Sequence, residues 1–269
     1  MIFFKSKQEN SHVFTHASES PVVAIMGMMR SGTSLVARML NLCGLYLDSP
    51  RHMIPPTDSN PTGHWELKEF MELNNQLLEK FGGSWDHPPH LIRGWEADKS
   101  LAGFYEKAGK IIRKRFRTQT LWGWKDPRAS LTFPFWKNVL FKMKSVICLR
   151  HPLDVARSLE ARNGIPVAHG LHLWLHYIQS AFEQVPPQER VVTCYENYFS
   201  NLEDELLKVT SFIGLSSASI PWDEIRSFIT QSLWHNRMGA SGESDMDLLP
   251  STIRSCYQRL LNEANRVQI

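Results

Sequence analysis

The sequence predicts an α/β protein in which a central parallel β-sheet is flanked by helices, giving three layers. Four short apolar runs fit strands that are buried on both faces of such a sheet. Segments with apolar residues at helical spacing follow these runs, and this alternation favours parallel strands joined by right-handed crossovers. With 42% hydrophobic residues in 269, the chain has enough apolar side chains for a large core.

The N-terminal segment is predicted to be a flexible arm, and the rest of the chain one domain. Residues 1–20 mix serine, histidine and charged residues without any period. Residues 21–269 suit a single α/β domain, a class that often reaches this length. The opening MIFFKSKQEN has too short an apolar stretch for a signal peptide, and no window approaches 18 uninterrupted apolar residues. We therefore expect no integral membrane segment.

The first strand is predicted at residues 22–26, where five apolar residues follow Pro21. After a turn, apolar residues recur at helical spacing as far as Cys43, and Gly44 is a plausible C-cap. Residues 45–63 contain four prolines and form a long connection, which in a compact domain is usually functional or mobile. Helical spacing returns over residues 67–81.

The later elements alternate in the same way. The predicted strands are 121–124, 145–149 and 191–195. The predicted helices are 101–117, one from about 153, 168–184, one that passes through Leu202 and Phe212 to stop at Gly214, and about 250–266. A polar linker is expected at 241–247, before the last helix.

Charge and cysteine content narrow the classes of partner and compartment. Thirty Lys and Arg residues against 27 Asp and Glu give a net charge of +3, which is too small to predict binding to nucleic acid. The four cysteines lie apart in apolar runs, as buried free thiols do. This pattern favours a reducing compartment, and we expect a cytoplasmic protein. The oligomeric state cannot be predicted.

The segment after the first strand has the pattern of a phosphate-binding loop. Gly27 and Gly32 frame a turn that leads into a helix, so backbone N–H groups and the helix N-terminus converge on one point. The spacing fits the nucleotide loop G-x4-G-K-[ST] except that Thr33 replaces the lysine. The only cation in the loop is Arg30. A kinase or NTP hydrolase would thus lack its main charge on the transferred phosphoryl group.

Four segments together resemble the sulfotransferase family. Arg30-Ser31-Gly32-Thr33-Ser34 resembles the family's segment for the 5′-phosphate side of 3′-phosphoadenosine 5′-phosphosulfate. Arg150 and Ser158, eight residues apart, resemble its segment for the 3′-phosphate. Tyr195 with Glu196 looks like the strand whose tyrosine lies near the adenine, and Lys125-Asp126-Pro127-Arg128 resembles an element of the bacterial and tyrosylprotein-type branches.

The resemblance implies a P-loop NTPase-like fold and transfer of a sulfuryl group to a hydroxyl or amine. The donor would be converted to adenosine 3′,5′-bisphosphate. No metal is required, because lysine and backbone N–H groups can neutralise the leaving oxygen. The acceptor, a small molecule or a glycan, cannot be identified, but residues 45–63 and 82–98 are expected to shape its pocket.

The resemblance also suggests catalytic residues. Lys125, at the end of a predicted strand, is the candidate for the bridging oxygen. Pro127 stands where phenol and steroid members have a histidine, so that base is absent. Other branches use a glutamate after the first helix, and Glu66 fits, with a pKa expected to be raised by burial. His64 is the second candidate for the base, and a helix-dipole role for Glu66 stays open.

Other patterns are weaker. Basic residues crowd positions 107–117, which is typical of a solvated helix face, although an anionic acceptor is an alternative. His169, His172 and His176 share a helical face, but no carboxylate or cysteine completes a metal site. Trp234-His235-Asn236-Arg237 is a weak candidate to complete the donor site.

Two other functions remain open. A nucleotide or small-molecule kinase on the same loop is disfavoured by Thr33. A non-catalytic module that binds the phosphoadenosine nucleotide without turnover has the same nucleotide-binding motifs.

Overall fold

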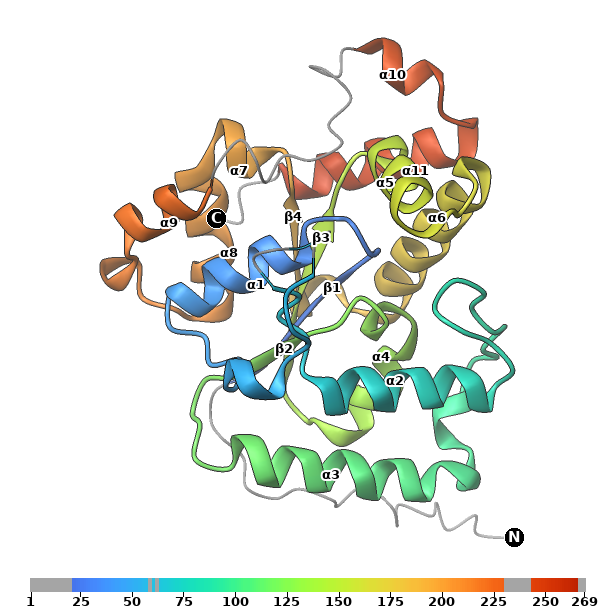
Figure 1. Cartoon of the computed structure of the whole chain (residues 1–269), viewed down its shortest axis with the longest axis vertical. Coiled ribbons are helices and arrows are strands. Elements are labelled where there is room, and N and C mark those ends of the chain that lie inside the picture. The colour runs from blue at the N-terminus through green and yellow to red at the C-terminus, as the bar shows by residue number, and fades with distance from the viewer. Residues whose placement is uncertain (1–20, 58–59, 61–62, 230–242, 266–269) are drawn as a thin grey trace, which may run out of the picture.

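The structure of the chain is a computed structural model, and it describes residues 21–57, 60, 63–229 and 243–265 (Figure 1). Four parallel strands form one sheet in the order β2-β1-β3-β4. The strands are β1 (Val22–Gly27), β2 (Gly123–Lys125), β3 (Met143–Leu149) and β4 (Arg190–Cys194). The α/β class with a central parallel sheet is therefore confirmed.

Helices follow the strands as the sequence periodicity predicts. The longer helices are α1 (Thr33–Leu42), α2 (Lys68–Lys80), α3 (Ala102–Phe116), α4 (Ala129–Val139), α5 (Pro152–Asn163), α6 (Val167–Gln184), α8 (Leu202–Ile213) and α11 (Ser251–Ala264). Shorter helices are α7 (Asn197–Ser200), α9 (Trp222–Phe228) and α10 (Glu243–Asp247). None of these helices has both the length and the apolar character that a membrane crossing needs.

The helices cover both faces of the sheet (Figure 1). Successive strand residues point to opposite faces, so Ala24 and Met26 join one apolar cluster while Val23 and Ile25 join the other. The first cluster packs the sheet against α2 to α6 and α11. The second packs it against α1, α8 and α9. The sheet is thus the middle of three layers.

Several segments differ from the prediction. The short helices α7 and α9 lie where no helix was predicted, and the second strand spans Gly123–Lys125 instead of 121–124. Helix α4 was missed because Pro134 lies inside it, and a proline removes one backbone donor from a helix interior. The expected polar linker at 241–247 contains α10 instead, from Glu243 to Asp247. Aspartate, glutamate and serine are compatible with a short helix even where no apolar face announces it.

Candidate functional site

The predicted site residues lie at the carboxyl edge of the sheet. Gly27 ends β1 and Lys125 ends β2, while Arg150 and Tyr195 directly follow β3 and β4. All four strands are parallel, so these ends meet at the same edge, where α/β sheets bind ligands. The order β2-β1-β3-β4 places the β1 loop between Lys125 on one side and Arg150 on the other.

The loop from Gly27 to Gly32 needs glycine at both ends. Gly27 has φ 138°, and a Cβ there would lie 2.5 Å from the carbonyl oxygen of Cys148. Gly32 has φ 83° and is the N-cap of α1. Among the described residues, no side chain caps this helix. Its first N–H groups and its dipole are therefore available to an anion.

Five residues from three loops and a helix form what we call the arginine cluster: Arg30, Gly32, Arg150, Ser158 and Tyr195. The Arg30 Nε donates a hydrogen bond to Ser158 Oγ at 2.8 Å. The Arg150 Nη1 donates to the carbonyl oxygen of Arg30 at 3.0 Å. The Arg150 guanidinium also lies 4.4 Å from the centre of the Tyr195 ring. That ring packs on Gly32, where a Cβ would come within 2.3 Å of it.

The arginine cluster is an electropositive, largely buried site. Burial and the nearby charges of Arg162 and Arg150 lower the pKa of Arg30 to about 10. The Arg150 Nη2 lies 3.9 Å from Asp154 Oδ2. Like charges gathered in this way repel one another, so an anion bound among them would relieve the repulsion. The sequence had not singled out Arg162, which follows Ser158 by one helical turn on α5.

Four charged residues form a second group, the Glu66 cluster: Glu66, Lys125, Asp126 and Arg128. The Lys125 Nζ donates to Glu66 Oε1 at 2.6 Å. The Arg128 Nη1 donates to Glu66 Oε2 at 3.2 Å and to Asp126 Oδ1 at 2.8 Å. All four residues are buried. Helix α2, which begins just after Glu66, thus brings this carboxylate to the ends of β2 and α4.

The expected pKa of Glu66 is corrected by this geometry. Burial alone raises the pKa of a carboxyl group, which was the basis of the prediction. In the structure, the charges and hydrogen bonds of Lys125 and Arg128 outweigh burial and lower the pKa of Glu66. The carboxylates of Asp126 and Glu66 in turn raise the pKa of Arg128. Glu66 is therefore an ionised, paired carboxylate in the protein without ligand.

His64 lies between the two clusters. Its Nε2 is 3.0 Å from Thr57 Oγ1, and its backbone carbonyl accepts a hydrogen bond from Ser34 Oγ at 3.1 Å. Burial lowers its pKa, and the positive charges of Lys125, Arg162 and Arg30 lower it further. His64 is thus neutral near pH 7 and connects the start of α1 with the segment that carries Glu66.

Asn74 of α2 supports the Glu66 cluster from behind. Its Nδ2 donates to Asp126 Oδ2 at 2.8 Å. Its Oδ1 accepts from Thr132 Oγ1 at 2.8 Å and from Trp136 Nε1 at 2.9 Å. No motif surrounds Asn74 in the sequence, so sequence reasoning missed this role. The one signal that could have found it is a polar residue at a helical position otherwise occupied by leucine and phenylalanine.

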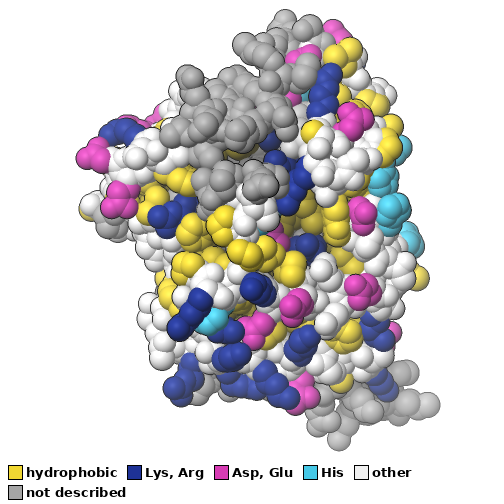
Figure 2. Space-filling view, viewed as in Figure 1, with side chains coloured by type: hydrophobic (Ala, Val, Ile, Leu, Met, Phe, Trp, Pro, Cys, Tyr) yellow, Lys and Arg dark blue, Asp and Glu magenta, His cyan; other side chains and the backbone are white. Residues whose placement is uncertain are grey.

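The weaker sequence patterns stay outside these clusters. Lys114 and Arg115 pair with Glu69, Lys110 pairs with Glu106, and Lys and Arg side chains gather on the surface at the α3 end of the molecule (Figure 2). His169 bonds to the carbonyl oxygen of Asp86. Within the described ranges no group of His, Cys, Asp and Glu has metal-site geometry. Residues 234–237 lie outside the described residues.

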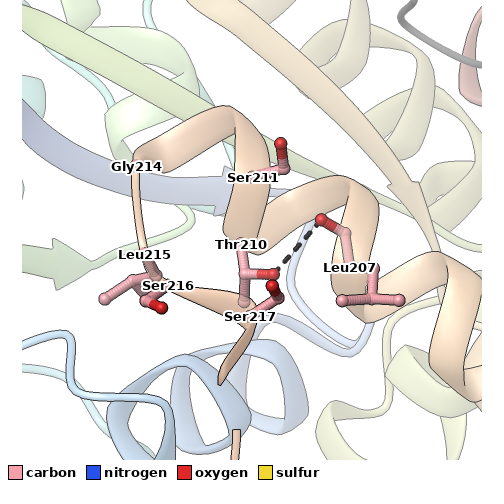
Figure 3. A pocket seen from close by; sticks show the side chains of 7 residues that line it. All are labelled: Leu207, Thr210, Ser211, Gly214, Leu215, Ser216 and Ser217. Carbon is pink, nitrogen blue, oxygen red and sulfur yellow. Dashed lines mark hydrogen bonds between the residues drawn. The ribbon is translucent and has the colours of Figure 1, made fainter. Parts of the chain in front are cut away.

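A surface pocket of about 530 Å³ lies elsewhere, around the C-terminal end of α8 (Figure 3). It is lined by Leu207, Thr210, Ser211, Gly214, Leu215, Ser216 and Ser217. Lys144, near the start of β3, donates to the carbonyl oxygen of Phe212 in this region. The pocket is therefore at the sheet edge where strands begin, opposite the two clusters, and its lining carries no charged side chain.

Comparisons with known proteins agree with this fold and identify the family. A family model described as "Sulfotransferase family" matches residues 21–219, most of the chain. A solved sulfotransferase from Mycobacterium avium, STF9, superimposes with a TM-score of 0.52 at 11% identity, covering 90% of this chain and 76% of that one. A sulfotransferase from Alicyclobacillus acidocaldarius gives 0.50 at 16% identity, with 92% and 96% covered.

A third solved structure, the sulfotransferase domain from the curacin biosynthetic pathway, gives a TM-score of 0.50 at 15% identity, covering 92% of this chain and 98% of that domain. No curated protein matches the sequence. At these identities the structural likenesses establish the fold.

Proposed function

Because the chain belongs to the sulfotransferase family, we propose that it transfers a sulfuryl group from 3′-phosphoadenosine 5′-phosphosulfate to a hydroxyl or amine acceptor. The observation that carries the proposal is the row of cations along one sheet edge: Lys125 on one side and Arg150 on the other of a phosphate loop that holds Arg30 and lacks the nucleotide-type lysine. A donor with phosphate at one end and phosphosulfate at the other would meet cations at both.

The phosphate loop and the arginine cluster together fit such a donor. Ser31 Oγ, within the loop, is fully buried and has no hydrogen-bond partner within the described part of the chain. The uncapped start of α1 adds backbone donors. We propose that Ser31, Gly32, Thr33 and Ser34 bind the 5′-phosphate side and that Arg150 and Ser158 bind the 3′-phosphate. The Arg30 guanidinium, bonded to Ser158, would link the two sites.

Tyr195 is proposed to border the adenine. Its ring lies against Gly32 of the loop and beside the Arg150 guanidinium. Burial raises the pKa of Tyr195, and the phenol therefore stays neutral through the physiological range. A neutral aromatic face beside two arginines suits a stacked base next to a phosphate.

The Glu66 cluster supports a mechanism in which Lys125 changes partner. With the donor bound, the Lys125 Nζ would leave Glu66 and donate to the oxygen that bridges phosphorus and sulfur. Glu66 would then keep Arg128 alone, so its pKa would rise and it would become a better base. The acceptor's proton moves to Glu66 as its oxygen or nitrogen bonds to sulfur, and the bridging S–O bond breaks with its electron pair on the departing bisphosphate. His64, neutral and close by, is the alternative base.

The decisive experiment combines nucleotide binding with transfer. Calorimetry should show adenosine 3′,5′-bisphosphate binding without Mg²⁺, and the ³⁵S-labelled donor should label at least one member of a panel of phenols, alcohols, amines and glycans. Glu66→Gln should retain bisphosphate binding and lose about two or more orders of magnitude in turnover. Binding without any transfer across the panel would favour a non-catalytic module. A preference for ATP with Mg²⁺ over the bisphosphate would favour a kinase.

We also propose a cytoplasmic location. Cys43, Cys148, Cys194 and Cys256 are all free and buried, and burial raises the pKa of Cys43 to about 11. Unreactive, unpaired thiols of this kind suit a reducing compartment.

A further inference from the structure

Trp65 has a backbone conformation that its side chain disfavours. Its φ is 57°, in the left-handed region, and among the described non-glycine residues only Arg30 and Asp48 share a positive φ. A bulky aromatic residue in this region is an outlier that persists only when its surroundings hold it there. Arg30, which shares this conformation, belongs to the arginine cluster. Trp65 directly precedes Glu66, so its conformation also bears on a residue of the site.

Contacts of the indole ring with α1, with an apolar cluster and with Gly63 hold Trp65 in place. The Arg38 guanidinium of α1 lies 4.9 Å from the centre of the indole ring, as in a cation–π contact. Its Nη1 also donates to Asn41 Oδ1 at 3.0 Å, which supports this orientation of the guanidinium. The half-buried ring also packs on the apolar cluster between the sheet and α1. Gly63, with φ 94°, lets the chain turn beneath the ring, where a Cβ would lie 3.6 Å from the indole nitrogen.

The residues on each side of Trp65 are buried in the site. His64 and Glu66 are 9% and 7% exposed. The backbone around them is bonded to two other segments, since Ser34 Oγ donates to the His64 carbonyl and Ile54 N donates to the Glu66 carbonyl at 2.9 Å. With both neighbours fixed, the φ of Trp65 sets the rotation between them, and hence the direction in which the Glu66 carboxylate leaves the chain.

We infer that Trp65, held by Arg38, is a positioning residue that aims the Glu66 carboxylate at Lys125 and Arg128. The inference rests on the proposed sulfuryl transfer, in which Glu66 takes the acceptor's proton. It assigns no contact with substrate to Trp65. Loss of the indole anchor would let residue 65 relax to an extended conformation, and the carboxylate would lose its alignment with both cations. Alignment errors of about 1 Å can reduce a rate by about a hundredfold.

The test compares Trp65→Ala and Trp65→Phe with a matched control on the same apolar cluster. Trp222 is also half-buried and packs on that cluster, and the Arg226 guanidinium lies 5.8 Å from its ring centre, but its backbone is ordinary. We expect Trp65→Ala to lower kcat by about 10- to 100-fold, with the bisphosphate Kd changed by less than about threefold. Trp65→Phe should recover most of the rate, and Trp222→Ala should keep it.

Arg38→Met provides a second variant that leaves the indole in place and removes the cation. It should lower kcat in the same direction as Trp65→Ala, by a smaller factor. Equal kcat in Trp65→Ala and wild type would overturn the inference. The inference would also be overturned if Trp65→Ala lost kcat, bisphosphate affinity and thermal stability together and Trp222→Ala showed the same losses. Such a result would mean that the tryptophan contributes only to packing.

A crystal structure of Trp65→Ala with adenosine 3′,5′-bisphosphate separates this inference from the proposed function. If the wild-type protein transfers sulfate to no acceptor, the proposed function fails, yet the position of the Glu66 carboxylate can still be measured. A carboxylate turned away from Lys125 and Arg128 in the variant supports the positioning role. A carboxylate that matches the position it holds in the wild-type complex refutes it.

Discussion

The Glu66 carboxylate is bonded to two cations, Lys125 and Arg128, and this decides the pH at which it can act as a base. The profile of kcat/KM against pH reports groups of the free enzyme, in which Glu66 is still paired. Because pairing lowers the pKa of Glu66, the carboxylate stays ionised until the pH falls below its ordinary value of 4.5. His64 has an ordinary value of 6.5, which burial also lowers.

We therefore predict that the acid limb of kcat/KM lies below pH 4.5 and that activity is flat on the acid side from about pH 5 to 7. The measurement is a pH–rate profile with the best acceptor of the panel, with His64→Asn as the control. An acid limb between pH 4.5 and 6.5 that disappears in His64→Asn would assign the base to His64 instead.

At the scale of elements, the corner between β2 and α4 depends on a polar residue of a third element. Asn74 lies on the core face of α2. Its side-chain amide donates a hydrogen bond to Asp126 and accepts hydrogen bonds from Thr132 and Trp136. Helix α4 starts at Ala129, directly after Arg128, and Ser130 at its first turn accepts a hydrogen bond from the backbone N–H of Gly27 at 3.0 Å. The end of β1, the end of β2 and the start of α4 are thus connected behind the Glu66 cluster.

We predict that Asn74→Leu lowers the free energy of unfolding by about 3 kcal/mol, because a leucine leaves the Trp136 indole N–H and an Asp126 carboxylate oxygen without the partner that Asn74 provides, while the Thr132 hydroxyl keeps only the Arg128 carbonyl. Urea unfolding followed by circular dichroism measures the change. Gln76→Leu, an exposed substitution on the same helix, is the control and should stay within about 0.5 kcal/mol of wild type. Equal stability of both variants would contradict a supporting role for Asn74.

At the scale of the whole molecule, the sheet order gathers charges that the chain disperses. Arg30, Lys125 and Arg150 are far apart in sequence, yet all follow or end strands at one edge of the sheet. The net charge of +3 is small, so the positive potential that suits a bisphosphate nucleotide is local. A ligand that bridges these strand ends would stabilise the protein as a unit.

Adenosine 3′,5′-bisphosphate at about 100 times its Kd should stabilise the native state by about 2.7 kcal/mol. For a chain of this size, that corresponds to a rise in Tm of roughly 5–10 °C. Adenosine 5′-monophosphate, which lacks the 3′-phosphate, should give a clearly smaller shift at the same concentration. Arg150→Ala should remove most of the difference between the two nucleotides, whereas Arg254→Ala, which alters a surface pair with Asp247, should preserve it. Equal shifts with both nucleotides in the wild type would contradict the 3′-phosphate site.

The sequence by itself determined the α/β class, the strands and most helices. Each strand or helix must bury one face, and the resulting apolar runs and helical spacing are visible in the sequence whatever element it packs against. It also determined the phosphate loop, whose glycines and helix start are adjacent in the chain. Sequence reasoning did not predict α4, because Pro134 lies inside it and proline disfavours a helix interior. The burial of most of its side chains against the rest of the protein outweighs that cost. The candidate residues themselves could be selected by motif, since each motif is contiguous.

Only the tertiary structure decided how those residues meet. The bond from Arg30 to Ser158 spans 128 residues and the bond from Lys125 to Glu66 spans 59, and no local pattern encodes either. The pKa of Glu66 depends on this, because burial pushes it up while two cations from β2 and α4 push it down by more. Coulombic effects depend on distances in space, which the order of residues does not specify until the sheet brings its strand ends together.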